Sequence, residues 1–240
     1  PNGACKTTTI RMIMGILKPD DGAIGFSFAE SDPKQFRERV GYLPEERGLY
    51  EDAKIHELLV YLAEIKGVAR SEARKQATHW LKRMDLSEWA GKKVEKLSKG
   101  MQQKVQFIAA IQHRPDLVIL DEPFSGLDPV HQDAIKGFIH ELRDEGMTVL
   151  LSSHQMNRVE ELCDRIFLMH RGHRVLYGDL DEIKASYGDH IVQLRFEGDG
   201  HSLAELPGVQ NLTLKADRAQ FILERAHDPD GFVRNIPEGL

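Results

Sequence analysis

The chain opens with a short run of residues whose types and order could bind phosphate. Residues 1–8 read Pro-Asn-Gly-Ala-Cys-Lys-Thr-Thr and precede Thr9–Leu17, which we expect to be helical. In loops of the form G-x-x-x-x-G-K-S/T, backbone N–H groups surround the phosphates, the lysine reaches the β and γ oxygens, and the hydroxyl holds Mg²⁺. Lys6 and Thr7 suit the last two roles. The other loop residues expected to contact phosphate are Asn2, Gly3, Ala4, Cys5 and Thr8. Taken alone, the pattern also fits a helix N-terminus that carries an incidental lysine.

Cys5 stands where this pattern has its second glycine. A glycine there lets the backbone turn and approach phosphate without a Cβ in the way. We therefore expect the thiol side chain to weaken nucleotide binding. Three explanations stay open: a natural impaired variant, a tolerated substitution, or an error of one base in the reading of the gene. The chain also begins at Pro1, without the first glycine of the pattern, so we expect it to start inside a longer protein.

A second group of residues that could do chemistry follows an apolar run. Residues 117–120, Leu-Val-Ile-Leu, predict a buried strand that delivers Asp121 and Glu122 to its carboxyl end. Asp121 suits a Mg²⁺ ligand that acts through water, and Glu122 suits the base that orients or deprotonates an attacking water. Paired acids at a strand end are common, but their occurrence after a phosphate-binding pattern favours a nucleotide hydrolase.

The third group is Leu97–Gln103, Leu-Ser-Lys-Gly-Met-Gln-Gln, in which Ser98 is placed to cap the helix that follows. An ordinary capped helix would explain Ser98 by itself. With these neighbours, the segment resembles the signature motif of the ABC ATPase family. The resemblance implies that Ser98 and Gly100 present a hydroxyl and a backbone N–H to the γ-phosphate bound on the opposite subunit.

Further motifs of that family occur in the same order along the chain. Residues 40–45 resemble the loop that senses Mg²⁺ and couples to the membrane partner, with Glu45 where most relatives carry glutamine. We interpret Glu45 as a variation that can still approach the metal. Residues 125–128, Ser-Gly-Leu-Asp, resemble the loop between the two subunits, although Asp128 could simply cap a helix starting near Pro129. His154 follows a predicted strand, where the family has a switch histidine that contacts the γ-phosphate; a purely structural histidine is the alternative.

Strand-like and helix-like segments alternate along the part of the chain that carries these residues. This alternation predicts an α/β fold with a mostly parallel sheet, and the resemblance implies a P-loop NTPase. A second strand is expected at 147–151, helical periodicity covers about 54–94, and a helix is expected from Lys99 to His113 before Pro115. We expect an ABC ATPase domain over 1–188, with a helical subdomain at about 52–114. Short alternating runs at 190–196, 209–214 and 220–223 predict a small β-rich accessory domain over 189–240.

Composition indicates which classes of partner and which cellular compartment to expect. The formal net charge is −6, which gives no general attraction to nucleic acid, and we expect no nucleic-acid partner. No apolar run approaches the roughly 18 residues of a membrane span, so a membrane role must come through a partner. Cys5 and Cys163 have no metal-ligand spacing, which favours a reducing compartment.

Together with these features, the resemblance implies the ATP-hydrolysing subunit of an ABC exporter that uses ATP and Mg²⁺. The resemblance, which extends to exporters of the sodium- or drug-efflux type, implies a homodimer beneath a membrane permease, peripheral on the cytoplasmic face of the plasma membrane. A non-hydrolysing nucleotide-responsive scaffold, impaired at Cys5, is the alternative. An ABC ATPase that works on DNA or ribosomes is disfavoured because residues 54–94 are short and lack heptads.

Overall fold

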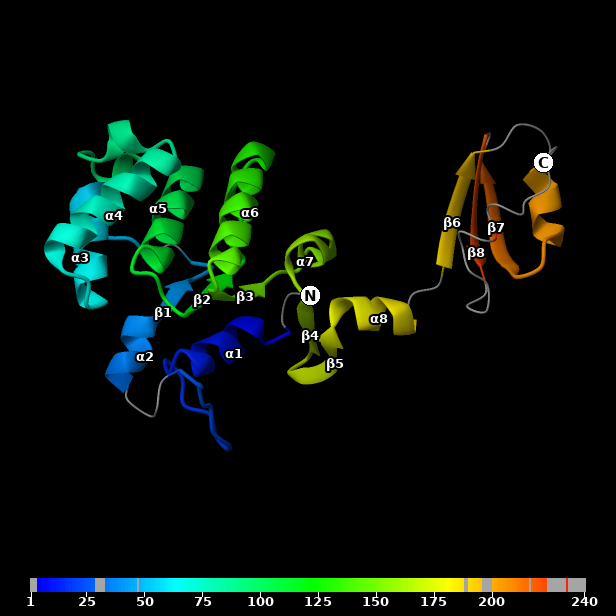
Figure 1. The fold of residues 1–240 in the computed structure, drawn as a ribbon, viewed down its shortest axis with the longest axis horizontal. Coiled ribbons are helices and arrows are strands. Elements are labelled where there is room, and N and C mark those ends of the chain that lie inside the picture. Colours follow the sequence, from blue (N-terminus) through cyan, green and yellow to red (C-terminus); the bar gives the residue numbers. More distant parts are fainter. Residues whose placement is uncertain are drawn as a thin grey trace. The chain divides into compact units, whose positions relative to one another are not determined.

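The computed structural model describes residues 4–28, 33–46, 48–187, 190–195, 200–215, 217–223 and 232 (Figure 1). Two of the residues expected to contact phosphate, Asn2 and Gly3, lie outside the described residues. The chain divides into two compact units, Pro1–Tyr177 and Gly178–Leu240. All residues predicted to do chemistry belong to the first unit.

A parallel three-stranded sheet forms the centre of the first unit. Its order is β1 (Val40–Leu43), β2 (Leu117–Asp121) and β3 (Thr148–Ser152). Leu43 pairs with Leu120, and Asp121 pairs with Ser152. The predicted parallel sheet is therefore confirmed. Because all three strands run in one direction, the residues that follow their carboxyl ends meet at one edge.

The two faces of this sheet are covered by different helices. On one face, Leu117 and Ile119 of β2 pack with Ile10 of α1 (Lys6–Ile13). On the other, Val118 and Leu120 join a larger cluster with α5 (Lys99–Ile111) and α6 (Pro129–Asp144). The alternation follows from the two-residue period of a strand. Figure 1 shows α1 on one side of the strands and α5 and α6 on the other.

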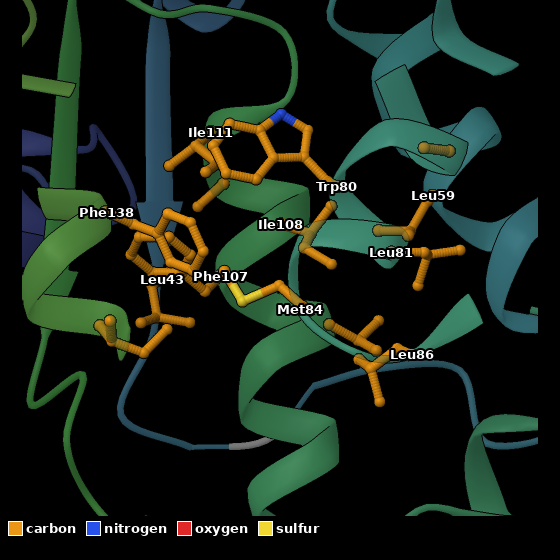
Figure 2. Packing of buried hydrophobic residues seen from close by; sticks show 14 of the residues in the cluster. Leu43, Leu59, Trp80, Leu81, Met84, Leu86, Phe107, Ile108, Ile111 and Phe138 are labelled. Atoms are coloured by element: carbon orange, nitrogen blue, oxygen red, sulfur yellow. The ribbon is translucent and has the colours of Figure 1, made fainter. Parts of the chain in front are cut away.

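The predicted helical region is confirmed. It comprises α3 (Ile55–Ile65), α4 (Arg70–Arg83) and two short 3₁₀ turns, Ser87–Trp89 and Val94–Lys96. Its apolar side chains belong to the same cluster as those of α5. Figure 2 shows Phe107 and Ile108 of α5 between Phe138 of α6 on one side and Leu81 of α4 on the other. A short helix, α2 (Pro33–Arg39), leads directly into β1.

Helix α5 lies very close to β1 because Gly41 has no side chain. A Cβ built on Gly41 would lie 1.9 Å from the Ala110 carbonyl oxygen of α5. No real side chain tolerates that distance, so only glycine allows this packing. The predicted end of α5 at His113 was two residues too far, since the helix ends at Ile111 with Gln112 as its cap.

The prediction of helix over Thr9–Leu17 was wrong at both ends. Helix α1 begins at Lys6, directly after the loop, and ends at Ile13. Gly15 adopts a φ of 66°, and its N–H donates to the Met12 carbonyl at 3.0 Å. The N–H of the next residue reaches back to the Arg11 carbonyl at 2.9 Å. This is a Schellman cap, which ends a helix wherever a glycine takes the left-handed conformation.

The remaining elements complete both units. In the first unit, α7 (Met156–Leu162) is followed by a two-stranded sheet of β4 (Arg165–His170) and β5 (His173–Asp179), whose last two residues fall in the second unit. The second unit contains α8 (Leu180–Tyr187), β6 (His190–Arg195), a 3₁₀ segment (Gly200–Glu205), β7 (Val209–Lys215) and β8 (Arg218–Leu223). Its antiparallel sheet has the order β6-β8-β7, which confirms the three strands predicted there.

His113, just after α5, gives the first unit a predictable dependence on pH. Burial of the ring, assisted by the Lys66 ammonium group, lowers the pKa of His113 from 6.5 to about 4, although the Val40 carbonyl acts in the opposite direction. The unfolded chain therefore binds more protons than the folded chain between these values. Folding stability should fall by up to about 3 kcal/mol as the pH drops from 6.5 to 4.

Urea unfolding at pH 7 and pH 4.5 would measure this loss. A His113→Gln variant cannot take up the proton, so its unfolding midpoint should depend less on pH than that of the parent. Equal pH dependence in the two proteins would show that His113 does not cause it.

Candidate functional site

The centre of the site is a buried carboxylate at the end of β2. Asp121 is fully buried, and its Oδ1 accepts a short hydrogen bond from the Ser152 hydroxyl of β3. Its other oxygen, Oδ2, is also buried and has no hydrogen-bond partner among the residues that the structure describes. Leaving a carboxylate oxygen unpaired in a protein interior is costly. The arrangement is therefore suited to a cation or a water at Oδ2.

Glu122 lies beside Asp121 and is held by contacts at both its backbone and its side chain. Its N–H donates to the backbone oxygen and to the Oγ of Ser152, each at 3.2 Å. Its φ is 50°, in the left-handed region. Glu122 Oε1 lies 2.9 Å from His154 Nδ1 and 3.8 Å from Lys6 Nζ. Because a carboxylate oxygen can only accept, Nδ1 carries the proton in this hydrogen bond. Two predicted residues, Lys6 and His154, thus converge on one oxygen of a third, Glu122.

The phosphate-binding pattern leads directly into the N-terminus of α1. Ala4 is buried, Lys6 and Thr7 are half-buried, and Thr8 is exposed. The first N–H groups of a helix lack partners within it and attract anions. Cys5, the residue before the helix, has φ 69° and ψ 22°. Glycine adopts this left-handed conformation without cost, whereas a residue with a Cβ is strained in it. Cys5 is therefore strained at this position.

The loop after β1 brings further carboxylates to the same edge of the sheet. Glu45 is exposed and follows the end of β1 by two residues. Burial raises the pKa of the Tyr42 hydroxyl, and the negative charges of Asp121, Glu45 and Glu46 add to this effect, while Arg11 opposes it. Asp121 ends β2 and Glu45 follows β1, so both lie at the edge where these parallel strands have their carboxyl ends.

The other predicted residues form a separate group at the start of α5. Ser98 caps the helix as expected, since its Oγ accepts from the Met101 N–H at 3.3 Å. A Cβ on Gly100 would lie 3.5 Å from Leu127 and 3.8 Å from the Gly126 carbonyl oxygen. The signature segment therefore lies against the loop of residues 125–128.

Asp128, in that loop, caps a helix, which was the structural alternative to a role between the two subunits. It caps α6, with its carboxylate accepting from the His131 N–H at 3.1 Å. That hydrogen bond, with a second from the His131 ring, lowers the pKa of Asp128. Pro129 occupies the first turn of α6, as expected for a helix start.

Sequence reasoning missed Ser152, Gln103 and Gln106. Ser152 bridges Asp121 and Glu122, but only the register of β3 beside β2 shows this. Its position in Ser152-Ser153-His154, directly after a predicted strand, was the available indication. Gln103 and Gln106 are buried on α5, and two polar residues on a buried helix face could have identified them.

The described residues are compatible with the Mg²⁺ that the resemblance implies. In the part of the chain that the structure describes, no group of three His, Cys, Asp or Glu residues could hold a metal ion by itself. A magnesium site that takes few protein ligands and several waters or phosphates does not need such a group. The buried, unpaired Oδ2 of Asp121 fits that pattern, and Thr7, in the first turn of α1, offers a hydroxyl as a second ligand.

Comparisons with known proteins agree with this geometry. The family model described as ABC transporter matches residues 1–125, and one described as AAA domain, putative AbiEii toxin, Type IV TA system matches residues 93–160. The uncharacterized ABC transporter ATP-binding protein YhaQ of Bacillus subtilis is 44% identical over 90% of this chain and 72% of its own length.

Two further matches extend over most of the chain. The linearmycin resistance ATP-binding protein LnrL of Bacillus subtilis is 34% identical over 95% of this chain and 75% of its own length. A solved structure of the ATP binding subunit of an ABC transporter is 34% identical, with a TM-score of 0.73, over 78% of this chain and 79% of that one. The chain therefore belongs to the family of ABC transporter ATP-binding proteins and carries an ABC ATPase domain, the domain that binds ATP.

Proposed function

We propose that two copies of this chain close around two ATP molecules and hydrolyse them to drive an exporter. The observation that carries the proposal is the convergence of Lys6 and His154 on Glu122 Oε1, next to the unpaired Oδ2 of Asp121. A base, a phosphate-binding cation and a metal-binding carboxylate are thus gathered at the N-terminus of α1. Phosphoryl transfer depends chiefly on such positioning and charge stabilisation.

Each residue has a distinct task in this proposal. The N-terminus of α1 and Lys6 bind the β- and γ-phosphates. Thr7, Asp121 and Glu45 hold Mg²⁺, which when bound neutralises charge that develops on the phosphate oxygens. Glu122 accepts a proton from the attacking water, and His154 orients the Glu122 carboxylate and contacts the γ-phosphate.

The proposed dimer is supported by the resemblance, which assigns the two groups of site residues to different chains of one shared site. Ser98 and Gly100 contact their own helix and the loop at 125–128. Lys6, Asp121, Glu122 and His154 lie at the sheet edge. Each complete site would combine Lys6, Thr7, Asp121 and Glu122 of one chain with Ser98 and Gly100 of the other. Closure would exclude water from the γ-phosphate and so couple hydrolysis to motion.

Mixing two inactive variants tests the shared site. Lys6→Ala and Ser98→Arg chains should each lose turnover alone, because every site in either homodimer is defective. In a mixed dimer, one site combines an intact Lys6 with an intact Ser98. An equal mixture should therefore recover about a quarter of parental ATPase activity, since half the dimers are mixed and half their sites are intact. No recovery on mixing would argue against sites shared between chains.

The cellular role extends beyond the site and rests on relatives. We propose an ATPase domain to about residue 188, a helical subdomain at about 52–114 that contacts a membrane permease, and a location on the cytoplasmic face of the membrane. Among the residues that the structure describes, no helix is long and apolar enough to cross a membrane. Efflux is supported by the similarity to a linearmycin resistance protein.

One observation favours the alternative of a nucleotide-responsive scaffold without turnover. Cys5 is strained in a conformation that suits glycine, directly before the helix that would bind phosphate. A chain that binds nucleotide weakly could respond to it without hydrolysis. Comparing Cys5 with glycine at this position decides between the two functions.

A further inference from the structure

Helix α5, which begins within the signature segment, and its C-cap residue carry four buried polar side chains. They are Gln103, Lys104, Gln106 and Gln112. Each donates a hydrogen bond to the backbone carbonyl of a different segment of the chain. The four acceptors are the carbonyls of Pro123, Met84, Glu46 and Leu59, respectively. Two of these segments belong to the helical region, and the other two are loops at the nucleotide site.

The first site loop is held by Gln103. This side chain is 2% exposed, and its Nε2 donates to the Pro123 carbonyl at 3.2 Å. Pro123 directly follows Glu122, whose left-handed backbone begins a turn that is closed by the Ser125 N–H at 3.0 Å. Gln103 therefore holds a carbonyl within the turn, while Ser152 holds the Glu122 N–H at its start.

The second site loop is held by Gln106, one helical turn further along α5. It is 4% exposed, and its Nε2 donates to the Glu46 carbonyl at 3.4 Å, a longer and weaker hydrogen bond. Glu46 follows Glu45, the proposed metal-sensing residue. Among the residues that the structure describes, no backbone N–H donates to the carbonyl of Glu46 or of Pro123.

Gln106 is not explained by the packing of α5. Its Oε1 is buried and has no hydrogen-bond partner within the described residues. A buried, unpaired amide oxygen destabilises a fold, and a leucine of similar size would avoid that cost. What leucine could not do is hold the Glu46 carbonyl.

We propose that Gln103 and Gln106 are positioning residues that fasten the loops bearing Glu122 and Glu45 to the signature helix. The helix that presents Ser98 to the partner's site would then move together with the base and the metal-sensing loop of its own site. This inference rests on the proposed function, since it assigns a role in ATP hydrolysis.

Gln112, the residue that caps the end of α5, supplies a matched control. It is 1% exposed, donates to the Leu59 carbonyl at 2.8 Å, and also has a buried Oε1 without a partner in the described residues. Gln112→Leu is therefore the same chemical change as Gln103→Leu or Gln106→Leu. It differs in that its acceptor lies in α3, away from both site loops.

Turnover of the three variants should be compared in a Cys5→Gly background. Losing one hydrogen bond of ordinary strength should lower kcat about fivefold in Gln103→Leu and about threefold in Gln106→Leu, with a smaller change in KM. The melting temperature of Gln106→Leu should be equal to or above that of the parent. Gln112→Leu should keep kcat within about twofold of the parent, the scatter expected from a change remote from the site.

Hydrogen exchange on the nucleotide-free chain tests the fastening itself. Amides in residues 121–127 should exchange about fivefold faster in Gln103→Leu, and those in residues 42–46 about threefold faster in Gln106→Leu. Gln112→Leu should change neither segment. Unchanged exchange in the first two variants, or equal changes in all three, would overturn the proposal. If the Cys5→Gly parent does not hydrolyse ATP but the variants show the expected changes in exchange, only the proposed hydrolysis is rejected. The inference that Gln103 and Gln106 hold the two site loops would then stand.

Discussion

Replacing Glu122 with glutamine should nearly abolish ATP turnover while leaving ATP binding intact. Glutamine keeps the size of the side chain and can remain near His154, but it cannot accept a proton from water. Removing a general base typically costs a factor of about 10² to 10⁴ in rate. Glu122 Oε1 is also the atom on which Lys6 and His154 converge, so the substitution changes the carboxylate at the centre of the proposed site.

The same substitution should also make the dimer visible. If closure precedes hydrolysis, the Glu122→Gln chain should accumulate as an ATP-bound dimer, which light scattering would detect as a doubled mass when ATP and Mg²⁺ are present. Glu88→Gln provides the control because Glu88 is an exposed carboxylate in a 3₁₀ turn. Normal turnover of Glu122→Gln would remove this residue from its proposed role.

Replacing Cys5 with glycine should strengthen nucleotide binding by about tenfold. The left-handed conformation of Cys5 costs a non-glycine residue about 1 to 2 kcal/mol. If nucleotide binding requires the loop to hold this conformation while the free loop can leave it, that cost lowers the affinity, and each 1.4 kcal/mol is a factor of about ten. The Cβ of Cys5 also projects from a loop that must approach phosphate closely. Titration with a fluorescent ATP analogue would measure the change, and ATPase assays would show whether turnover follows.

Cys5→Ala separates the backbone from the thiol. Alanine keeps a Cβ at the same positive φ but has no sulfur, so it should bind nucleotide about as weakly as cysteine. If alanine instead binds as tightly as glycine, the thiol and not the backbone conformation is responsible. Substantial turnover with Cys5 itself would support a working motor, and activity restricted to glycine would support the impaired scaffold.

Much of the fold could be predicted because it depends on local patterns. The apolar run before Asp121 formed β2, and the step of three and four residues formed α3. Caps were equally predictable, since Ser98 and Asp128 bond to N–H groups only three residues away. The end of α1 was not, because the left-handed conformation of Gly15 decides it.

The site likewise has features that could be predicted from the sequence and features that depend on the tertiary structure. Residue types and spacing alone pointed to Lys6, Asp121 and Glu122, because a phosphate loop and a strand-end acid pair are defined by neighbours in the chain. That Lys6 and His154 share one oxygen of Glu122 depends on the order of the strands and on which face α1 covers. These contacts join residues more than a hundred positions apart, or on strands whose register no local pattern sets.

The sequence by itself determined which groups were available for chemistry: a lysine and a hydroxyl after a loop, two acids after a strand, and a serine before a helix. Tertiary structure alone decided how they are held. Ser152 reaches Asp121 because β3 pairs with β2 in one register, and a shift by one residue would point its side chain to the other face. Gln103 and Gln106 reach the site loops because Gly41 lets α5 lie against β1, a close approach that depends on the packing of distant segments.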